Sequence, residues 1–253
     1  MPQGKNNKKL NKGIFIQARM SSSRFPQKML KQCGNLTLVE YVFERCLTST
    51  EADLIKIVTS EAASDDCLYE YCMSKKIPIA RGPLENVLLR YVLAAEEVDC
   101  SIICRVCGDS PFVDVSLMDK MFIIAENEAI DYIAPQKSTC LPGLDSEVIT
   151  LNTLHKISKI NLTEDEREHV TLYIRDHLSS FNTKIINSNL QPKGIDNIFL
   201  TVDYPIDLLL INEIISFLND KYDFTSDKIF DILLKQTYLL EIINLCKSKR
   251  NHE

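Results

Sequence analysis

Residues 13–28 of the chain read GIFIQARMSSSRFPQK, a short apolar run that opens into a loop of cations and small residues. The run Ile14–Ile16 predicts a buried β-strand. The loop after it carries three consecutive serines and the cations Arg19, Arg24 and Lys28. Small side chains let backbone N–H groups approach an anion, and fixed positive charges neutralise that anion. The stretch therefore predicts a polyphosphate site at a strand end; the alternative is an ordinary strand-to-helix loop with surface cations.

The composition limits the classes of protein to which the chain can belong. With 253 residues, 45% of them hydrophobic, it is long and apolar enough for the core of one α/β domain. Its net charge of −6 provides no overall basic surface, so we expect no nucleic-acid partner. The sequence shows neither an apolar run near the length of a membrane span nor a signal peptide, which predicts no membrane contact and a cytoplasmic location.

Nine cysteines are scattered along the chain. Cys104 and Cys107 form the one CxxC pair, which lies in an apolar, strand-like run without a second pair or a nearby histidine. We expect reduced, mostly buried thiols, and a zinc site is the less favoured alternative.

Apolar strand-like and helix-like segments alternate from residue 13 onward. The expected strands are 14–18, 54–60, 77–80, 101–106, 131–134, 146–151 and 198–202. The expected helices are 36–46, 65–75, 85–97, 115–127, 153–160, 164–177, 206–219 and 226–245, the last with Ser226 as its N-cap. This order predicts a single α/β domain at 13–253, with a mostly parallel sheet and helices on both faces. Residues 1–12 are polar and basic and are expected to form a disordered arm, and a segment inserted at about 135–190 interrupts the alternation.

Two aspartates follow predicted strands at positions where open α/β sheets hold their ligands. Asp109 follows the strand at 101–106 and comes after Gly108, which permits close approach to a ligand. Asp203 follows the strand at 198–202. Asp114 fits a helix cap instead, and Asp207 is expected to be solvated in a first helical turn. Two carboxylates from separate strand ends, completed by triphosphate oxygens and water, would suit Mg²⁺.

The segment Gln17–Leu30 resembles the N-terminal signature of the cytidylyltransferases that activate acidic sugars, the CMP-sialate and CMP-ketodeoxyoctulosonate synthetases. The nearest branch is the SpsF-like spore-coat polysaccharide proteins, with the pattern QARM-x-S-T-R-L-P-x-K-x-L. Ser23 replaces the usual Thr, Phe25 the usual Leu, and Gln27 stands where Gly is common. Four further family elements follow in the same order as in the family: R-x-x-G-D-x-P-L-x-D at 105–114, G-x-D-x-E-V at 143–148, E-R-E-H-V-T at 166–171 and D-T-P-E-D at 203–207.

The resemblance implies a Rossmann-like fold of the nucleotide-diphospho-sugar transferase (GT-A-like) type with an inserted dimerisation arm, and hence a homodimer. It implies a Mg²⁺-dependent enzyme of surface polysaccharide biosynthesis that transfers CMP from CTP to an acidic sugar. The implied catalytic residues are Arg19, Lys28, Asp109 and Asp203, of which Asp109 and Asp203 hold the metal. The implied nucleotide contacts are Gln17, Ala18, Arg19, Ser22, Ser23, Arg24, Lys28, Ser60, Arg81, Arg105 and Gly108. The implied acceptor contacts are Asp145, Glu147, Arg167 and His169; for the stretch that holds the last two, a solvated face of alternating charge is an equally open interpretation.

Two other classes of function remain open. A glycosyltransferase that uses a nucleotide sugar would need a similar fold and an acidic metal site, because a fold does not determine the reaction. A non-catalytic nucleotide-binding module is the other alternative. The cations at 19–28 favour a triphosphate over a sugar diphosphate, and the presence of both Asp109 and Asp203 favours an enzyme.

Overall fold

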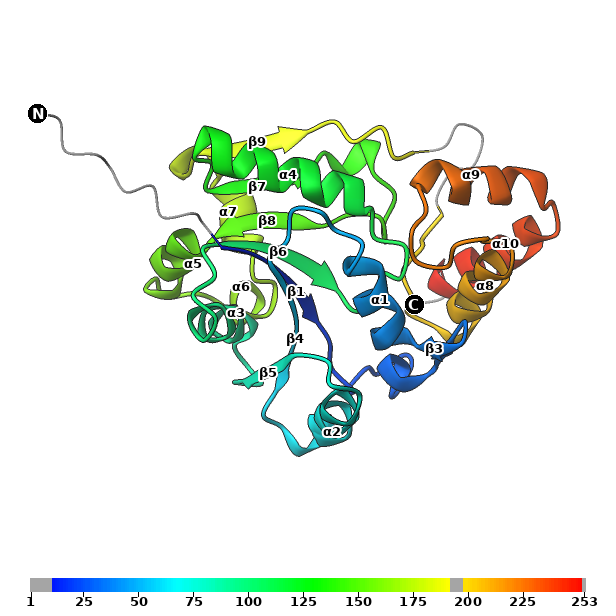
Figure 1. Ribbon diagram of the computed structural model, residues 1–253, viewed down its shortest axis with the longest axis horizontal. Helices are drawn as coiled ribbons and strands as arrows, with labels where there is room; N and C mark the ends of the chain where they lie inside the picture. The colour runs from blue at the N-terminus through cyan, green and yellow to red at the C-terminus, as the bar shows by residue number, and fades with distance from the viewer. Residues whose placement is uncertain (1–10, 192–197, 252–253) are drawn as a thin grey trace, which may run out of the picture.

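The computed structural model describes residues 11–191 and 198–251, so most of the predicted arm at 1–12 lies outside the described residues. Within them, one 7-stranded sheet has the order β5-β4-β1-β6-β8-β7-β9 (Figure 1). The strands are β1 (Lys12–Gln17), β4 (Leu54–Ser60), β5 (Ile79–Gly82), β6 (Ile102–Cys107), β7 (Tyr132–Pro135), β8 (Glu147–Thr150) and β9 (Thr183–Ile186). A separate small hairpin pairs β2 (Gln32–Cys33) with β3 (Leu36–Thr37).

The sheet is mostly parallel, as the sequence predicted. β1 pairs in parallel with β4 and β6, β4 with β5, and β7 with β9, while β8 is antiparallel to both of its neighbours. The carboxyl ends of β1, β4 and β6 therefore meet at one edge of the sheet. The loops that leave this edge supply the candidate site, which is where open α/β sheets bind their ligands.

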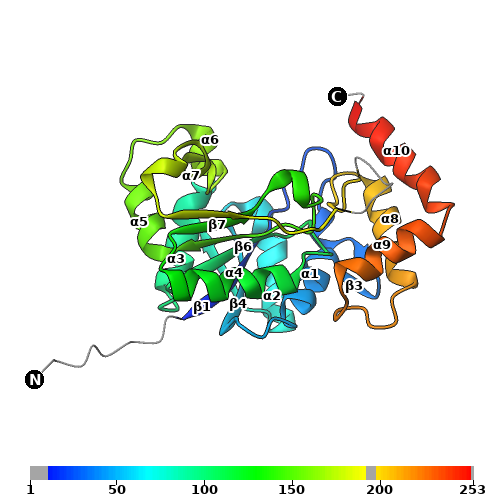
Figure 2. The same cartoon turned by 90° about the horizontal axis from the view of Figure 1, so that it is seen from above.

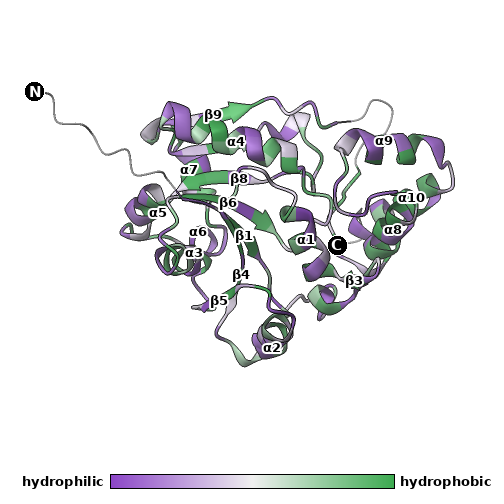
Figure 3. Ribbon diagram, in the orientation of Figure 1, coloured by the Kyte–Doolittle hydropathy of each residue, from purple (hydrophilic) through white to green (hydrophobic). Residues whose placement is uncertain are grey.

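Helices cover both faces of the sheet (Figure 2). Ile14 and Ile16 of β1 pack in a core with residues of the helices α1, α4 and α8, whereas Phe15 packs on the opposite face with residues of α3 and α5. This alternation follows from the two-residue period of a strand buried on both sides, and Figure 3 shows the apolar strands between more polar helix surfaces. The helices are α1 (Leu38–Cys46), α2 (Asp66–Lys75), α3 (Val87–Glu96), α4 (Val115–Glu128), α5 (Leu151–Ser158), α6 (Glu164–Glu168), α7 (Leu172–Asp176), α8 (Pro205–Ser216), α9 (Ser226–Lys235) and α10 (Leu239–Asn251), with short 3₁₀ turns at Lys28–Leu30, Ala63–Asp65, Lys137–Thr139 and Leu178–Ser180.

The strand predicted at 198–202 is wrong. Ile198, Leu200 and Val202 are buried as a strand pattern requires, but the segment joins no ladder. The backbone N–H groups of Leu200 and Val202 donate instead to the carbonyl oxygens of Pro142 and Asp109, at 2.8 and 2.9 Å. An alternation of apolar residues indicates burial, but a strand also needs a neighbouring strand to pair with. Here the backbone partners of 198–202 belong to loops.

Several element boundaries also differ from the predictions. The predicted helix at 164–177 is split into α6 and α7, and the one at 226–245 into α9 and α10, whereas β9 was not predicted. The inserted segment predicted at about 135–190 contains β8 and β9, which extend the central sheet. Lys12, assigned to the disordered arm, is buried in β1 because its ammonium pairs with Glu51 and Glu126 at 2.6 and 3.1 Å.

Most of the cysteines are buried free thiols; Cys67 is exposed and Cys107 is half-buried. None of the helices in the described ranges has the length and apolarity that crossing a membrane requires.

Candidate active site

The candidate site is built around the ammonium group of Lys28, where three distant segments of the chain meet. Lys28 Nζ donates to Asp109 Oδ2 and to the Val202 carbonyl oxygen, both at 2.7 Å, and lies 3.7 Å from Asp203 Oδ1. Lys28 itself is buried, whereas the two carboxylates remain partly exposed. The two predicted carboxylates thus converge on one cation, although only Asp109 follows a strand of the sheet.

Carboxylate oxygens are ligands that Mg²⁺ takes in proteins, so the donor set of Asp109 and Asp203 fits a divalent cation. No group of three His, Cys, Asp or Glu side chains that could hold a metal occurs in the described part of the chain. Asp109 and Asp203 would therefore supply part of a coordination shell, and oxygen atoms of a triphosphate and water would supply the rest.

Asp203 is held by contacts on several sides. Arg24 donates to its Oδ1 at 2.7 Å, and Thr201 Oγ1 lies 3.3 Å from its Oδ2. Its backbone N–H and that of Tyr204 both donate to Asp207 Oδ2 at 2.9 Å. The prediction that Asp207 is solvated is wrong, since only 1% of it is exposed. It caps the start of α8 instead, because these backbone N–H groups have no partner inside the helix.

The loop after β1 is anchored by Asp65, which the sequence analysis did not identify. Asp65 is fully buried; its Oδ1 accepts from the Met20 N–H at 2.7 Å, and its Oδ2 accepts from the Ser60 N–H and hydroxyl. Ser60, predicted to contact the nucleotide, is thus occupied with this anchor.

Gln27 has φ 58°, in the left-handed region that favours glycine, which agrees with its place at a position where the family commonly has Gly.

Gly108 makes a close approach, but to the protein. Its N–H donates to the Gln17 carbonyl oxygen at 2.8 Å. A Cβ atom at Gly108 would lie 2.9 Å from the same oxygen and 3.1 Å from both Ala18 Cβ and Met29 Sδ. The glycine therefore lets the ends of β1 and β6 and the loop pack together.

The other predicted nucleotide contacts have partners in different parts of the structure. Ser22 and Ser23 lie in the cation loop, where Ser22 Oγ accepts from the Phe25 N–H at 3.3 Å. Arg19 extends toward α6 and pairs with Glu168 at 2.8 Å, so the E-R-E-H-V-T segment does reach the loop. Arg81 is tied to the edge of the sheet, where it pairs with Asp66 at 2.7 Å.

A second buried network lies beside this site. Arg105 pairs with Glu147 at 2.9 Å and donates to Gln17 Oε1 at 3.2 Å. Glu147 also accepts from the Tyr132 hydroxyl at 2.5 Å and from Thr171 Oγ1 at 2.9 and 3.0 Å. Burial disfavours the charged carboxylate, but Arg105 and these donors outweigh burial and hold the pKa of Glu147 below its ordinary value.

A cavity of about 690 Å³ opens next to this network, between the strands and α7. Of the four predicted acceptor contacts, Asp145 and Glu147 line it, whereas Arg167 and the exposed His169 are not among the described residues that line it. The cations that line it besides Arg105 are Lys137 and Arg175, which the sequence analysis missed because no motif marks them. The buried Nε atoms of Arg105 and Arg175 have no hydrogen-bond partner within the described ranges.

Arg105, which lines the cavity, belongs to β6, the strand that Asp109 follows. Burial raises the pKa of the Cys107 thiol to about 11, Arg105 opposes this effect, and the charges of Asp109, Asp145 and Glu147 add to it. The Cys107 thiol, at the end of β6, is therefore affected by Asp109 of the candidate site and by Asp145 and Glu147 of the cavity.

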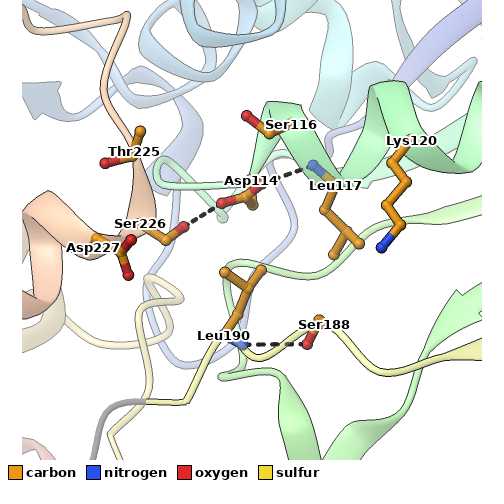
Figure 4. A pocket seen from close by; sticks show the side chains of 9 residues that line it. All are labelled: Asp114, Ser116, Leu117, Lys120, Ser188, Leu190, Thr225, Ser226 and Asp227. Carbon is orange, nitrogen blue, oxygen red and sulfur yellow. Dashed lines mark hydrogen bonds between the residues drawn. The ribbon is translucent and has the colours of Figure 1, made fainter.

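A smaller hollow, whose lining includes neither Asp109 nor Asp203, lies at the starts of α4 and α9 (Figure 4). There Asp114 accepts from the Leu117 N–H at 2.7 Å and from the Ser226 hydroxyl, which confirms Asp114 as the predicted cap of α4. Ser226 is not the cap of α9: Thr225 precedes the helix, and the Ser226 hydroxyl is used by Asp114.

Comparisons with known proteins agree with this geometry. A family model described as "Cytidylyltransferase" matches residues 14–238. The spore coat polysaccharide biosynthesis protein SpsF of Bacillus subtilis is 36% identical over 180 residues, which cover 69% of this chain and 74% of the relative. A 3-deoxy-manno-octulosonate cytidylyltransferase of Christiangramia forsetii is 27% identical over 138 residues, 54% of each chain. The solved structure of a cytidylyltransferase from Leptospira borgpetersenii superposes with a TM-score of 0.82 at 27% identity, covering 93% of this chain and 98% of the other.

Proposed function

This chain belongs to the cytidylyltransferase family, a family of nucleotidyltransferases, and on that premise we propose that it transfers CMP from CTP to an acidic sugar with release of pyrophosphate. The acceptor class and the metal are part of the proposal. The observation that carries it is the convergence of the Asp109 and Asp203 carboxylates on the buried Lys28 ammonium, with Arg24 beside them.

The proposed chemistry is an in-line displacement at the α-phosphorus of CTP. The acceptor hydroxyl oxygen forms the new P–O bond and loses its proton to solvent water, the bond between the α-phosphorus and the bridging oxygen of the β-phosphate breaks, and pyrophosphate leaves. Asp109 and Asp203 would hold Mg²⁺, which when bound offsets charge on the phosphate oxygens. Arg19, Arg24 and Lys28 would orient the triphosphate and stabilise the charge that builds up on the leaving pyrophosphate.

The cavity beside Arg105 is our proposed acceptor pocket. Its volume of about 690 Å³ suits a small sugar acid. Both arginines have a buried Nε without a partner among the described residues, but the guanidinium of Arg105 is already paired with Glu147. Arg175, with Lys137 at the rim, is thus the best-placed group to receive a carboxylate of the acceptor.

The test is pyrophosphate release over a panel of four nucleoside triphosphates and several sugar acids, each with a neutral sugar of the same size. We expect release with CTP and a sugar acid, and none when Asp109 or Asp203 is replaced with asparagine. Sugar transfer from a nucleotide sugar without pyrophosphate release would instead favour a glycosyltransferase.

A further inference from the structure

The helix α10 reaches the candidate site through Arg250. Its guanidinium forms a fork on Asp207, with NH1 2.7 Å from Oδ1 and NH2 2.8 Å from Oδ2. NH2 also lies 3.6 Å from Asp203 Oδ2. The guanidinium carbon lies 4.6 Å from the Phe199 ring centroid, so the group is held by both charge and packing.

Hydrogen bonds through Asp207 link Arg250 to the backbone of Asp203. Arg250 fixes both oxygens of Asp207, and Asp207 Oδ2 accepts the backbone N–H groups of Asp203 and Tyr204. Asp207 is 1% exposed and the Arg250 side chain 14%, so the pair is shielded from water and its geometry is well defined. Arg250, 47 positions after Asp203 in the sequence, therefore contacts the side chain that caps the Asp203 backbone N–H.

Arg250 lies beyond residues 14–238, the part of the chain that the family model matches. The helix that carries it, α10, packs against α8, the helix that Asp207 caps. The same fork also balances the charge of Asp207, which would otherwise add a third carboxylate next to Asp109 and Asp203.

We propose that Arg250 is a positioning residue that orients Asp203 to bind the divalent cation, and that α10 is thereby part of the active site. This inference rests on the proposed function. Replacing a residue that lies outside the coordination shell and holds a metal ligand in place commonly changes metal affinity by about 10- to 100-fold. The effect should therefore appear in metal-dependent nucleotide binding as well as in turnover.

The test measures CTP affinity by calorimetry with and without Mg²⁺, and the ratio of the two affinities is the gain due to the metal. Arg250→Met alone leaves the buried Asp207 charge unpaired and can destabilise the fold. The informative variant is therefore Arg250→Met combined with Asp207→Asn, which leaves no unpaired charge and keeps an amide oxygen for the N–H groups of Asp203 and Tyr204. Arg250→Lys keeps the charge without the fork, and Lys247→Met on the same helix is the matched control.

We expect the metal-dependent gain to fall about tenfold or more in the double variant and by a smaller factor in Arg250→Lys. It should stay unchanged in Lys247→Met, and CTP affinity without Mg²⁺ should stay unchanged in all variants. Wild-type gain in the double variant and in Arg250→Lys, or an equal loss with and without Mg²⁺, would overturn the inference and leave the proposed function standing. Absence of any gain in the wild type would instead overturn the proposed metal site, and this inference with it.

Discussion

Replacing Lys28 with methionine removes the charge between Asp109 and Asp203 while keeping the length of the side chain. If Lys28 were an exposed loop residue, the change would cost no more than about 0.5 kcal/mol of stability. The structure revises that expectation, because Lys28 is 7% exposed and its ammonium donates to Asp109 and to the Val202 carbonyl oxygen.

The magnitude follows from these contacts. Removing one partner of a fully buried ion pair costs about 3–5 kcal/mol. Asp109 and Asp203 keep 24% and 21% of their side-chain surface exposed, so water replaces part of the lost interaction. We therefore expect a loss of about 1–3 kcal/mol, or about 2–4 °C in Tm for each kcal/mol. A lost charge-assisted hydrogen bond to the triphosphate would lower kcat/KM for CTP by about 10- to 100-fold.

The assay combines melting curves with and without Mg²⁺ and kcat/KM for CTP, with Lys31→Met, an exposed lysine of the same loop, as control. Because the metal and the ammonium would share the two carboxylates, Mg²⁺ should raise the Tm of Lys28→Met more than that of the wild type. A Lys28→Met protein that matches Lys31→Met in Tm, in its response to Mg²⁺ and in kcat/KM would refute the reasoning.

Asp109→Asn should abolish turnover in a protein that still melts cooperatively, because the carboxylate is not part of the core; near-normal Mg²⁺-dependent activity in the folded variant would contradict its role. Calorimetry should show CTP binding well ahead of ATP and GTP, and equal affinities would argue against a pyrimidine pocket. Light scattering should show a dimer rather than a 28.9 kDa monomer, through the region at 131–189, since stable interfaces usually bury about 1,200 Å² or more. Burial opposes the charge of Glu147, but Arg105 and the hydrogen bonds lower its pKa below 4.5. The ionised Glu147 therefore stabilises the fold above pH 4.5, and this stabilisation is lost as the pH falls through the lower pKa of the folded state. Urea unfolding should show that the difference in stability between wild type and Glu147→Gln shrinks as the pH falls below 4.5. A difference independent of pH would count against the Glu147–Arg105 pair.

The part of the site that could be predicted lies directly after strands. Asp109 and Lys28 follow β6 and β1 within a short stretch, and neighbouring parallel strands bring their carboxyl ends together, so local patterns were enough. The cap at Asp114 was predictable for the same reason, since it depends on residues only three positions apart.

Other residues could not be predicted because their partners are far away in the sequence. Asp65 resembled a helix start and is the anchor of the cation loop through Met20; Asp207 resembled a solvated residue and is a buried cap. Arg175 had no motif around it, and its importance comes only from the cavity that it lines.

By itself, the sequence determined the order of strands and helices from β1 to α5, apart from the β2–β3 hairpin, together with the cation loop and the two aspartates. Periodicity and turn chemistry act over a few residues, so a local stretch of sequence is enough to show them. Only the tertiary structure decided that 198–202 joins no ladder, that Lys28 is buried between Asp109 and Asp203, and that Arg250 holds Asp207. Strand pairing, desolvation and ion pairing depend on which groups lie within a few ångströms of one another. That proximity is created by packing of the whole chain rather than by any one segment of it.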